Sequence, residues 1–418
     1  MGELTVPVEE ATPVAPRGQR RFAWLWGPAF VAAIAYVDPG NVAANLTAGA
    51  RYGYLLAWVL VVANSMALLV QYLSAKLGLV TTRSLPELIG DRLGTRGRIA
   101  FWVQAELVAL ATDLAEVLGG AIALHILFGL PLLAGGVIVG AVSMLLLAVQ
   151  SRRGQRPFEF VVMGLLLVIT IGFTAGLFAS GVSWPDAAAG LVPRFSGTES
   201  VLLAASMLGA TVMPHAIYVH SALARDRHRS HASNLPRLLR ATRWDVAVSM
   251  LLAGTVNIAM LLLAAGSLQG IDHTDSIEGA HSAISAALGP VVGVLFGIGL
   301  LASGLASTSV GSYAGAAITS GLLRVRVSMP LLRLVTLIPA LAVLAIGVNP
   351  TWALVLSQVL LSFGLPFALV PLVWFTSRRD VMGPLANRPA LRVLAWIVVA
   401  LIVALNLTLI FLTLTASA

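Results

Sequence analysis

Apolar stretches long enough to cross a lipid bilayer recur along nearly all of this 418-residue chain. A helix needs about 20 consecutive apolar residues to span the hydrocarbon core of a membrane. Hydrophobic residues make up 58% of the sequence and charged residues 11%, whereas about a quarter of a soluble domain is charged. A transmembrane β-barrel would instead show short segments of alternating apolar and polar residues. The pattern therefore predicts an all-α protein that crosses the membrane many times.

The hydrophobic segments divide into eleven predicted transmembrane helices, of which the first and sixth contain a break. Their ranges are 23–49, 55–78, 99–126, 131–150, 158–182, 200–224, 244–268, 283–321, 329–347, 351–375 and 391–415. The eighth range is too long for one span, and we expect it to include a cytoplasmic extension. The polar segment 1–20 is expected to be a disordered cytoplasmic tail.

Basic residues fall in clusters between alternate hydrophobic segments, chiefly in ranges 76–98, 152–156, 225–243, 324–326 and 378–392. Cytoplasmic loops of membrane proteins carry an excess of lysine and arginine. The clusters therefore predict a cytoplasmic N-terminus and, after eleven spans, an external C-terminus. This placement argues against a nucleic-acid partner, although the formal net charge is +8. The chain has no cysteine, which excludes disulfides, thiolate metal ligands and thiol catalysis.

The first predicted span is interrupted by the sequence AYVDPGN at residues 35–41. Proline removes a backbone donor and clashes with the preceding turn, and glycine adds conformational freedom. The carbonyl groups that such a break frees are tolerated at membrane depth only where they face protein, water or a ligand. Asp38 beside them is costly in a membrane and marks a functional site by default. Freed carbonyls together with a carboxylate predict a cation site.

The sixth predicted span has a matching break at Met213-Pro214-His215. Interrupted helices at corresponding positions in two halves of a chain are typical of transporters built from inverted repeats, with the binding site at the midplane. The two breaks would bring Asp38, Asn41 and Met213 together. Oxygen ligands alone suit Mg²⁺ and Ca²⁺, whereas a thioether prefers softer transition metals. This donor set therefore favours Mn²⁺ or Fe²⁺.

Each of these residues also has a purely structural interpretation. Asp38 could form an interhelical ion pair without any role in transport. Asn41 could cap a helix or bond a neighbouring helix, and Met213 could simply fill the core, as most methionines do.

Both breaks resemble, in order and separation, the paired signature motifs of the NRAMP family of divalent metal transporters. The motifs are Asp38-Pro39-Gly40-Asn41 and Met213-Pro214-His215. The third and tenth spans are also similar to those of the family, through Glu106, Asp113 and Glu116, and through Gln358 followed by Leu365-Pro366-Phe367. The likeness runs from about residue 20 to residue 415.

The resemblance implies a LeuT-type fold, in which two inverted five-helix repeats are followed by one extra helix. The repeats would be residues 21–182 and 200–375, and the extra helix would be 391–415. A bacterial member would import Mn²⁺ or Fe²⁺ with protons across the inner (cytoplasmic) membrane. The metal would then be the substrate, so that neither a cofactor nor an enzymatic activity is expected. The expected partners are lipid, metal ions and protons, and the expected functional unit is a monomer.

The resemblance also implies a role for individual residues. Asp38, Asn41 and Met213 would bind the metal through their side chains. Ala35 and Ala210 would contribute backbone carbonyls, and Gln358 would join in another conformation. Members of related groups that are specialised for Mg²⁺ lack the methionine, so its presence agrees with the preference for softer metals.

A proton pathway needs ionisable groups inside the membrane. Asp38 is the first candidate, because an incoming metal would displace its proton. Glu106, Asp113 and Glu116 lie at spacings that place them along one face of the third helix, and such a stripe resembles a proton relay. The resemblance adds Arg333 as a partner, and His215 adjoins the second break. Structural ion pairs or hydrogen bonds are the alternative for these residues.

Three other functions remain open at this point. A carrier of organic substrates on the same fold would present helix N-termini to a substrate carboxylate, and a passive metal channel could use the same ligands. A membrane-embedded enzyme is disfavoured, because the chain has neither an H-E-x-x-H motif nor an evident nucleophile constellation.

Overall fold

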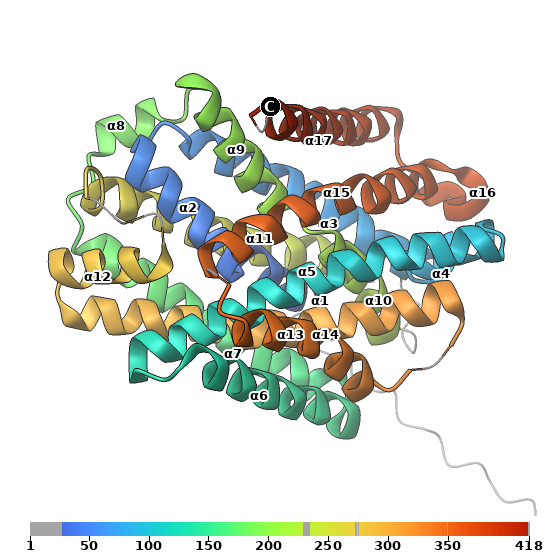
Figure 1. Ribbon diagram of the computed structural model, residues 1–418. Coiled ribbons are helices and arrows are strands. Elements are labelled where there is room, and N and C mark those ends of the chain that lie inside the picture. The colour runs from blue at the N-terminus through green and yellow to red at the C-terminus, as the bar shows by residue number, and fades with distance from the viewer. Residues whose placement is uncertain are drawn as a thin grey trace, which may run out of the picture.

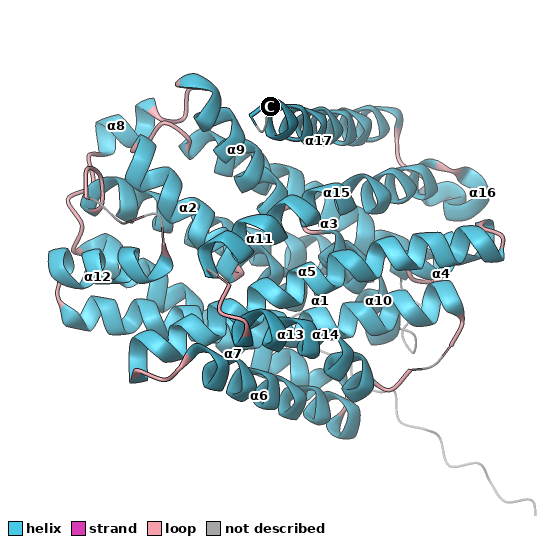
Figure 2. Ribbon diagram, viewed as in Figure 1, coloured by secondary structure: helices cyan, strands magenta, loops and turns pink. Residues whose placement is uncertain are grey.

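The computed structural model describes residues 27–228, 235–271, 274, 276–325, 327–348 and 350–416, and every regular element in these ranges is a helix (Figures 1 and 2). Eight helices are long and apolar enough to cross a membrane, and three shorter apolar helices cover 28–37, 132–148 and 331–345. Together they follow the order of the eleven predicted spans. The predicted disordered tail, 1–20, lies outside the described residues.

Fourteen α-helical segments correspond to the predicted spans. They are α1 (Pro28–Ala33), α2 (Pro39–Tyr52), α3 (Ala57–Thr81), α5 (Thr95–Phe128), α6 (Leu132–Arg153), α7 (Gln155–Thr174), α9 (Gly197–Thr211), α10 (Pro214–His228), α11 (Leu235–Ser267), α12 (Ile277–Leu288), α13 (Pro290–Leu323), α14 (Met329–Ala345), α15 (Pro350–Ser377) and α17 (Pro389–Ala416). The remaining elements are short: α4 (Leu85–Arg92), α8 (Trp184–Ala189), α16 (Arg379–Met382) and the 3-10 helices η2 (Ile34–Val37), η3 (Ala175–Phe178) and η5 (Gly383–Leu385).

The eighth predicted range, 283–321, proves to contain parts of two helices. Helix α12 ends at Leu288, the next residue, Gly289, has a φ of +94°, and α13 starts at Pro290. Glycine adopts this backbone conformation at little cost, and proline suits the first turn of a helix. The excess length therefore belongs partly to the separate helix α12, which the sequence interpretation did not anticipate.

The long helices run across the view of Figure 1, with α4 and α16 at one end and α8 and α12 at the other. The first of these ends carries a network of ion pairs, in which Asp91 bonds Arg83 and Arg324 and Asp380 bonds Arg92. We call it the basic end. It is the end at which the sequence places its arginine clusters.

The two broken helices lie in the interior. All the residues of α1 and η2 are buried, and α1 packs against α10 and α11. The start of α1 is held by Asp245 of α11, whose carboxylate accepts hydrogen bonds of 3.1 Å from the amides of Gly27 and Ala29. A carboxylate at this position satisfies amides that have no partner within their own helix. The first half of the broken helix is therefore anchored from a distant part of the chain.

Glycines allow close contact between α5 and α13. A Cβ atom on Gly304 would lie 2.9 Å from the Cα atom of Gly120 and 3.0 Å from the carbonyl oxygen of Glu116. Small residues at such positions let the backbones of membrane helices approach each other. This geometry gives Gly304 a role in helix packing.

We predict that Gly304→Ala lowers the thermal stability of the purified protein in detergent. Overpacking of this kind costs about 1–3 kcal/mol, because the new methyl group meets backbone atoms that have little room to move. Gly164→Ala is the matched control, since no heavy atom lies within 4 Å of its Cβ position. Equal melting temperatures for the two variants would contradict the proposed tight contact.

Candidate metal-binding site

Asp38 forms the start of α2 at the first break. Its backbone is extended, with φ −72° and ψ 167°, and its Oδ1 accepts hydrogen bonds from the backbone N of Asn41 at 2.8 Å and from Asn41 Nδ2 at 2.7 Å. The side chain is fully buried, and its second oxygen, Oδ2, has no hydrogen-bond partner among the described residues. One half of the carboxylate thus fixes the helix start, and the other half is available to a ligand.

Asn41 links the two breaks. Its Nδ2 donates to the carbonyl oxygen of Ala210 at 3.0 Å, and its Oδ1 accepts from Thr211 Oγ1 at 3.4 Å. Ala210 and Thr211 are the last residues of α9, directly before the second break. The predicted neighbours Asp38, Asn41 and Ala210 are therefore joined by hydrogen bonds.

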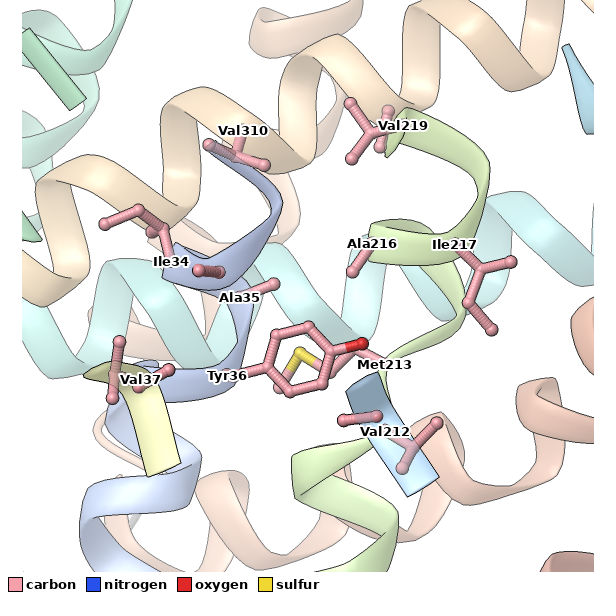
Figure 3. Packing of buried hydrophobic residues seen from close by; sticks show 14 of the residues in the cluster. Ile34, Ala35, Tyr36, Val37, Val212, Met213, Ala216, Ile217, Val219 and Val310 are labelled. Atoms are coloured by element: carbon pink, nitrogen blue, oxygen red, sulfur yellow. The ribbon is translucent and has the colours of Figure 1, made fainter. Parts of the chain in front are cut away.

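Met213 lies between α9 and α10, where the chain is not helical. Figure 3 shows Ala35 and Tyr36 on the first broken helix and the Met213 side chain directed toward them from the second. Ala35 and Met213 are both fully buried. The thioether is thus placed in the interior between the two breaks, as the hypothesis of a shared site requires.

Gln358 of α15 approaches the first break through the space left by Gly40. A Cβ atom on Gly40 would lie 1.8 Å from Gln358 Nε2 and 3.3 Å from Asp38 Oδ2. Neither amide atom of Gln358 has a hydrogen-bond partner among the described residues, although the residue is only 4% exposed. Glycine at position 40 therefore allows an unsatisfied amide to stand beside an unsatisfied carboxylate oxygen.

These contacts bear on the alternative interpretations. The described residues contain no arginine or lysine in an ion pair with Asp38. They also contain no group of three or more His, Cys, Asp or Glu side chains able to hold a metal. Leaving a buried polar atom without a partner costs about 1–3 kcal/mol, and a bound cation would supply the missing partner for Asp38. The donors present here suit a mixed oxygen and thioether site.

A second constellation surrounds Asp113 of α5. Its carboxylate forms an ion pair with Arg333 of α14, and Arg333 Nε donates to Ser143 Oγ of α6 at 2.7 Å. Arg333 is fully buried and Asp113 is 4% exposed. Three helices therefore meet at one arginine, which is the partner that the resemblance implied for the acidic stripe.

The other two acids of the predicted stripe lie on either side of this pair. Glu106 lines a small cavity together with Asp113, Gly311 and Leu332, with room for about one water molecule. Glu116 is fully buried, and among the described residues neither of its oxygens has a hydrogen-bond partner. It is close enough to Asp38 and Asp113 for their charges to interact. The three acids thus connect the first break with the cavity at Glu106.

Two histidines of α10 contact different helices. His215 Nδ1 lies 3.5 Å from Thr112 Oγ1 of α5. His220 Nδ1 lies 2.7 Å from Gln71 Oε1 of α3, and because an amide oxygen only accepts, the proton lies on Nδ1. His215 directly follows Pro214 at the second break, whereas His220 lies five residues further along α10.

Several polar residues around the site were not identified as functional from the sequence. The Tyr36 hydroxyl lies 2.5 Å from Gln71 Nε2, and the Tyr36 carbonyl accepts from Asn257 Nδ2 at 2.7 Å. Thr211 contacts Asn41, as described above. Two signals in the sequence could have identified these residues: Tyr36 lies inside AYVDPGN, and Thr211 lies just before the second break. Nothing in the sequence near Asn257 points to this contact.

Comparisons with known proteins identify the family. The family model described as "Natural resistance-associated macrophage protein-like" matches residues 29–412. The "Divalent metal cation transporter MntH" of Mycobacterium tuberculosis is 61% identical over 395 residues, which cover 94% of this chain and 92% of that protein.

Two solved structures extend the comparison. A crystal structure of the Eremococcus coleocola manganese transporter superposes with a TM-score of 0.85 at 31% identity, over 94% of this chain and 87% of that chain. A structure of Mhp1, a nucleobase-cation-symport-1 family transporter, superposes with a TM-score of 0.61 at 15% identity, over 92% and 89% of the two chains. The second likeness shows the fold alone.

The fold and the two broken helices define this chain as a multi-pass membrane transporter and not an enzyme. The predicted LeuT-type fold with an extra helix is confirmed. The chain belongs to the NRAMP family, the natural resistance-associated macrophage proteins. The repeat boundaries at 21–182 and 200–375 stay a prediction.

We predict that Arg333→Met strongly destabilises the protein, by about 3–5 kcal/mol, because it leaves the Asp113 carboxylate buried without its partner. The double variant Arg333→Met, Asp113→Asn should recover much of this loss, since no buried charge then remains unpaired. Thermal unfolding in detergent checks the order of the three proteins. A double variant no more stable than Arg333→Met would contradict an ion pair between these residues.

Proposed function

We propose that this protein imports a divalent transition metal, Mn²⁺ or Fe²⁺, into the cytoplasm together with protons. The observation that carries the proposal is the half-satisfied carboxylate of Asp38, buried at the first break and joined through Asn41 to the second break. The names of the M. tuberculosis relative, a divalent metal cation transporter, and of the E. coleocola manganese transporter support it.

The metal ligands would be the side chains of Asp38, Asn41 and Met213 and the carbonyl groups of Ala35 and Ala210. Gln358, whose amide stands beside Asp38 across Gly40, would join the metal in an occluded or outward-open conformation. Dehydrating a hard cation such as Mg²⁺ is costly, and a thioether offers it little in return, whereas Mn²⁺ and Fe²⁺ accept softer ligands. Met213 is therefore the group that we expect to separate these metals from the abundant Mg²⁺ and Ca²⁺.

Protons would travel from Asp38 through the acidic residues of α5. A metal arriving at Asp38 displaces a proton, and Glu116 is the acid placed to receive it. Asp113, paired with Arg333, would then pass the proton toward Glu106 and its cavity. His215, next to the second break, would influence protonation of the site. Ionisable groups inside a membrane are expensive and commonly form such relays.

The orientation follows from charge. The arginine clusters support a cytoplasmic position for the basic end, with the N-terminus inside, the C-terminus outside and the protein in the inner membrane of a bacterium. All the proposed ligands come from one chain, so that a monomer suffices. The metal is cargo, and no cofactor is required.

The first test is Mn²⁺ uptake into proteoliposomes, with excess Mg²⁺ or Ca²⁺ outside and the internal pH recorded. We expect saturable uptake with internal acidification for the wild type. Met213→Ala should lose discrimination against Ca²⁺ and Mg²⁺ by about tenfold or more, since each 1.4 kcal/mol of lost preference is a factor of ten.

Met207→Ala is the control for this experiment. Met207 is a fully buried methionine of α9 outside the break, so its truncation removes the same core volume and should leave the metal preference unchanged. Absence of Mn²⁺ uptake by a folded wild type would refute the metal proposal. Uptake without acidification would favour a metal channel.

We predict that Glu116→Gln reduces the number of protons that enter with each Mn²⁺ while the protein still binds the metal. The substitution preserves the shape of the side chain but removes its ability to accept a proton. Simultaneous recording of Mn²⁺ and proton fluxes checks this, with Glu199→Gln, at the start of α9, as control. An unchanged flux ratio in Glu116→Gln would exclude this residue from the proton route.

A further inference from the structure

A buried lysine at the basic end has no carboxylate partner among the described residues. Lys76, near the end of α3, is 6% exposed, and its Nζ donates to Asn387 Oδ1 at 2.9 Å. Asn387 is itself held by Thr376, through a bond of 3.0 Å from Nδ2. No ion pair of Lys76 with an acid is found in the described part of the chain. Buried ammonium groups are normally paired with an anion.

A charged side chain that acts on Lys76 has the same sign. Arg243 of α11 interacts electrostatically with Lys76. The guanidinium of Arg243 stands over the ring of Tyr72, 5.5 Å from its centre, and lies 3.5 Å from the Tyr72 hydroxyl. Arg243 is exposed, and its described contacts include no acid. Two neighbouring cations to which the described residues supply no counter-ion form a site that favours an anion.

The surroundings of this pair face the lipid. Tyr72 and Lys76 are four residues apart on α3 and so lie on one face. Toward the middle of the membrane, Leu68 of α3 and Leu251 of α11 are 40% and 67% exposed. Trp244, which is 56% exposed, follows Arg243. Tyrosine and tryptophan above basic residues, at the end of an apolar surface, are typical of the level of the lipid headgroups.

We propose that Lys76, Arg243 and Tyr72 form a binding site for the phosphate group of an acidic phospholipid in the leaflet at the basic end. The exposed guanidinium of Arg243 would bind the phosphate, and the tyrosine hydroxyl would donate to it. The field of Lys76 would favour lipids with a net negative charge over zwitterionic ones. The acyl chains would lie along the exposed apolar residues of α3 and α11, which pack against each other.

The charges on this surface explain why a lipid is the expected occupant. A soluble phosphate would use the same two cations but would gain nothing from Leu68, Leu251 and Trp244. A zwitterionic lipid would use the apolar surface, but the positive group of its headgroup would lie close to Arg243 and Lys76. Only an acidic phospholipid satisfies both parts of the site.

Native mass spectrometry of the full-length protein tests this proposal. The protein is titrated in detergent with phosphatidylglycerol, with phosphatidylcholine of the same acyl chains, or with inorganic phosphate. It is then released from the detergent in the mass spectrometer. We expect the wild type to retain phosphatidylglycerol preferentially. Arg243→Gln and Lys76→Gln should each weaken this binding by about fivefold, the effect of one basic residue near an anionic lipid, and leave phosphatidylcholine binding unchanged.

Arg324→Gln is the matched control, because it removes one charge from the same end but from an arginine that already bonds Asp91 at 3.1 Å. Arg243 is exposed, so Arg243→Gln provides the test even where Lys76→Gln does not fold. Equal retention of the two lipids by the wild type, or phosphatidylglycerol binding by Arg243→Gln equal to that of the control, would overturn the proposal. Displacement of the lipid by equimolar inorganic phosphate would identify a soluble phosphate as occupant and would also overturn it.

Discussion

The satisfaction of backbone carbonyls at the two helix breaks is the constraint on which the rest of the structure depends. Lipid offers no hydrogen bond to a backbone group, so the protein must supply each donor. Asn257 of α11 bonds the carbonyl of Tyr36, Ser303 of α13 bonds that of Val37, and Asn41 bonds that of Ala210. Each break is therefore stabilised by a side chain from a distant helix, and the helices that carry these donors have to surround it.

Other polar groups at the first break have no hydrogen-bond partner among the described residues. Asp38 Oδ2 and both amide atoms of Gln358 are buried without partners among the described residues, while Asp38 Oδ1 is bonded twice. Unpartnered buried atoms are rare in native proteins and require an explanation. Here they meet across Gly40, at the point where a ligand would enter between the breaks. Three unsatisfied buried atoms thus lie together at the position that the sequence marks with a broken helix.

Much of this arrangement could be predicted from sequence, because the strongest physical signals in a membrane protein are local. The length of apolar segments gave the spans, and Asp38-Pro39-Gly40 marked the first break. The split between α12 and α13 at Gly289 was missed, since hydropathy continues across it. The contact of Gly40 with Gln358 was also not predictable, because it joins residues more than 300 positions apart and depends on the packing of α15. The donors Asn257 and Ser303 escaped notice for the same reason.

Two buried aspartates show how pairing determines what an acid can do. Asp113 is held by Arg333, so that its charge is balanced whether or not a ligand is present. Asp38 has no such partner in the described residues, and an arginine in that position would occupy the place of the metal. Without a metal, a proton is the other cation that can bind Asp38 Oδ2, which has no partner among the described residues. A proton and a metal then compete for one oxygen, and we infer that this competition is the physical basis of the proposed coupling.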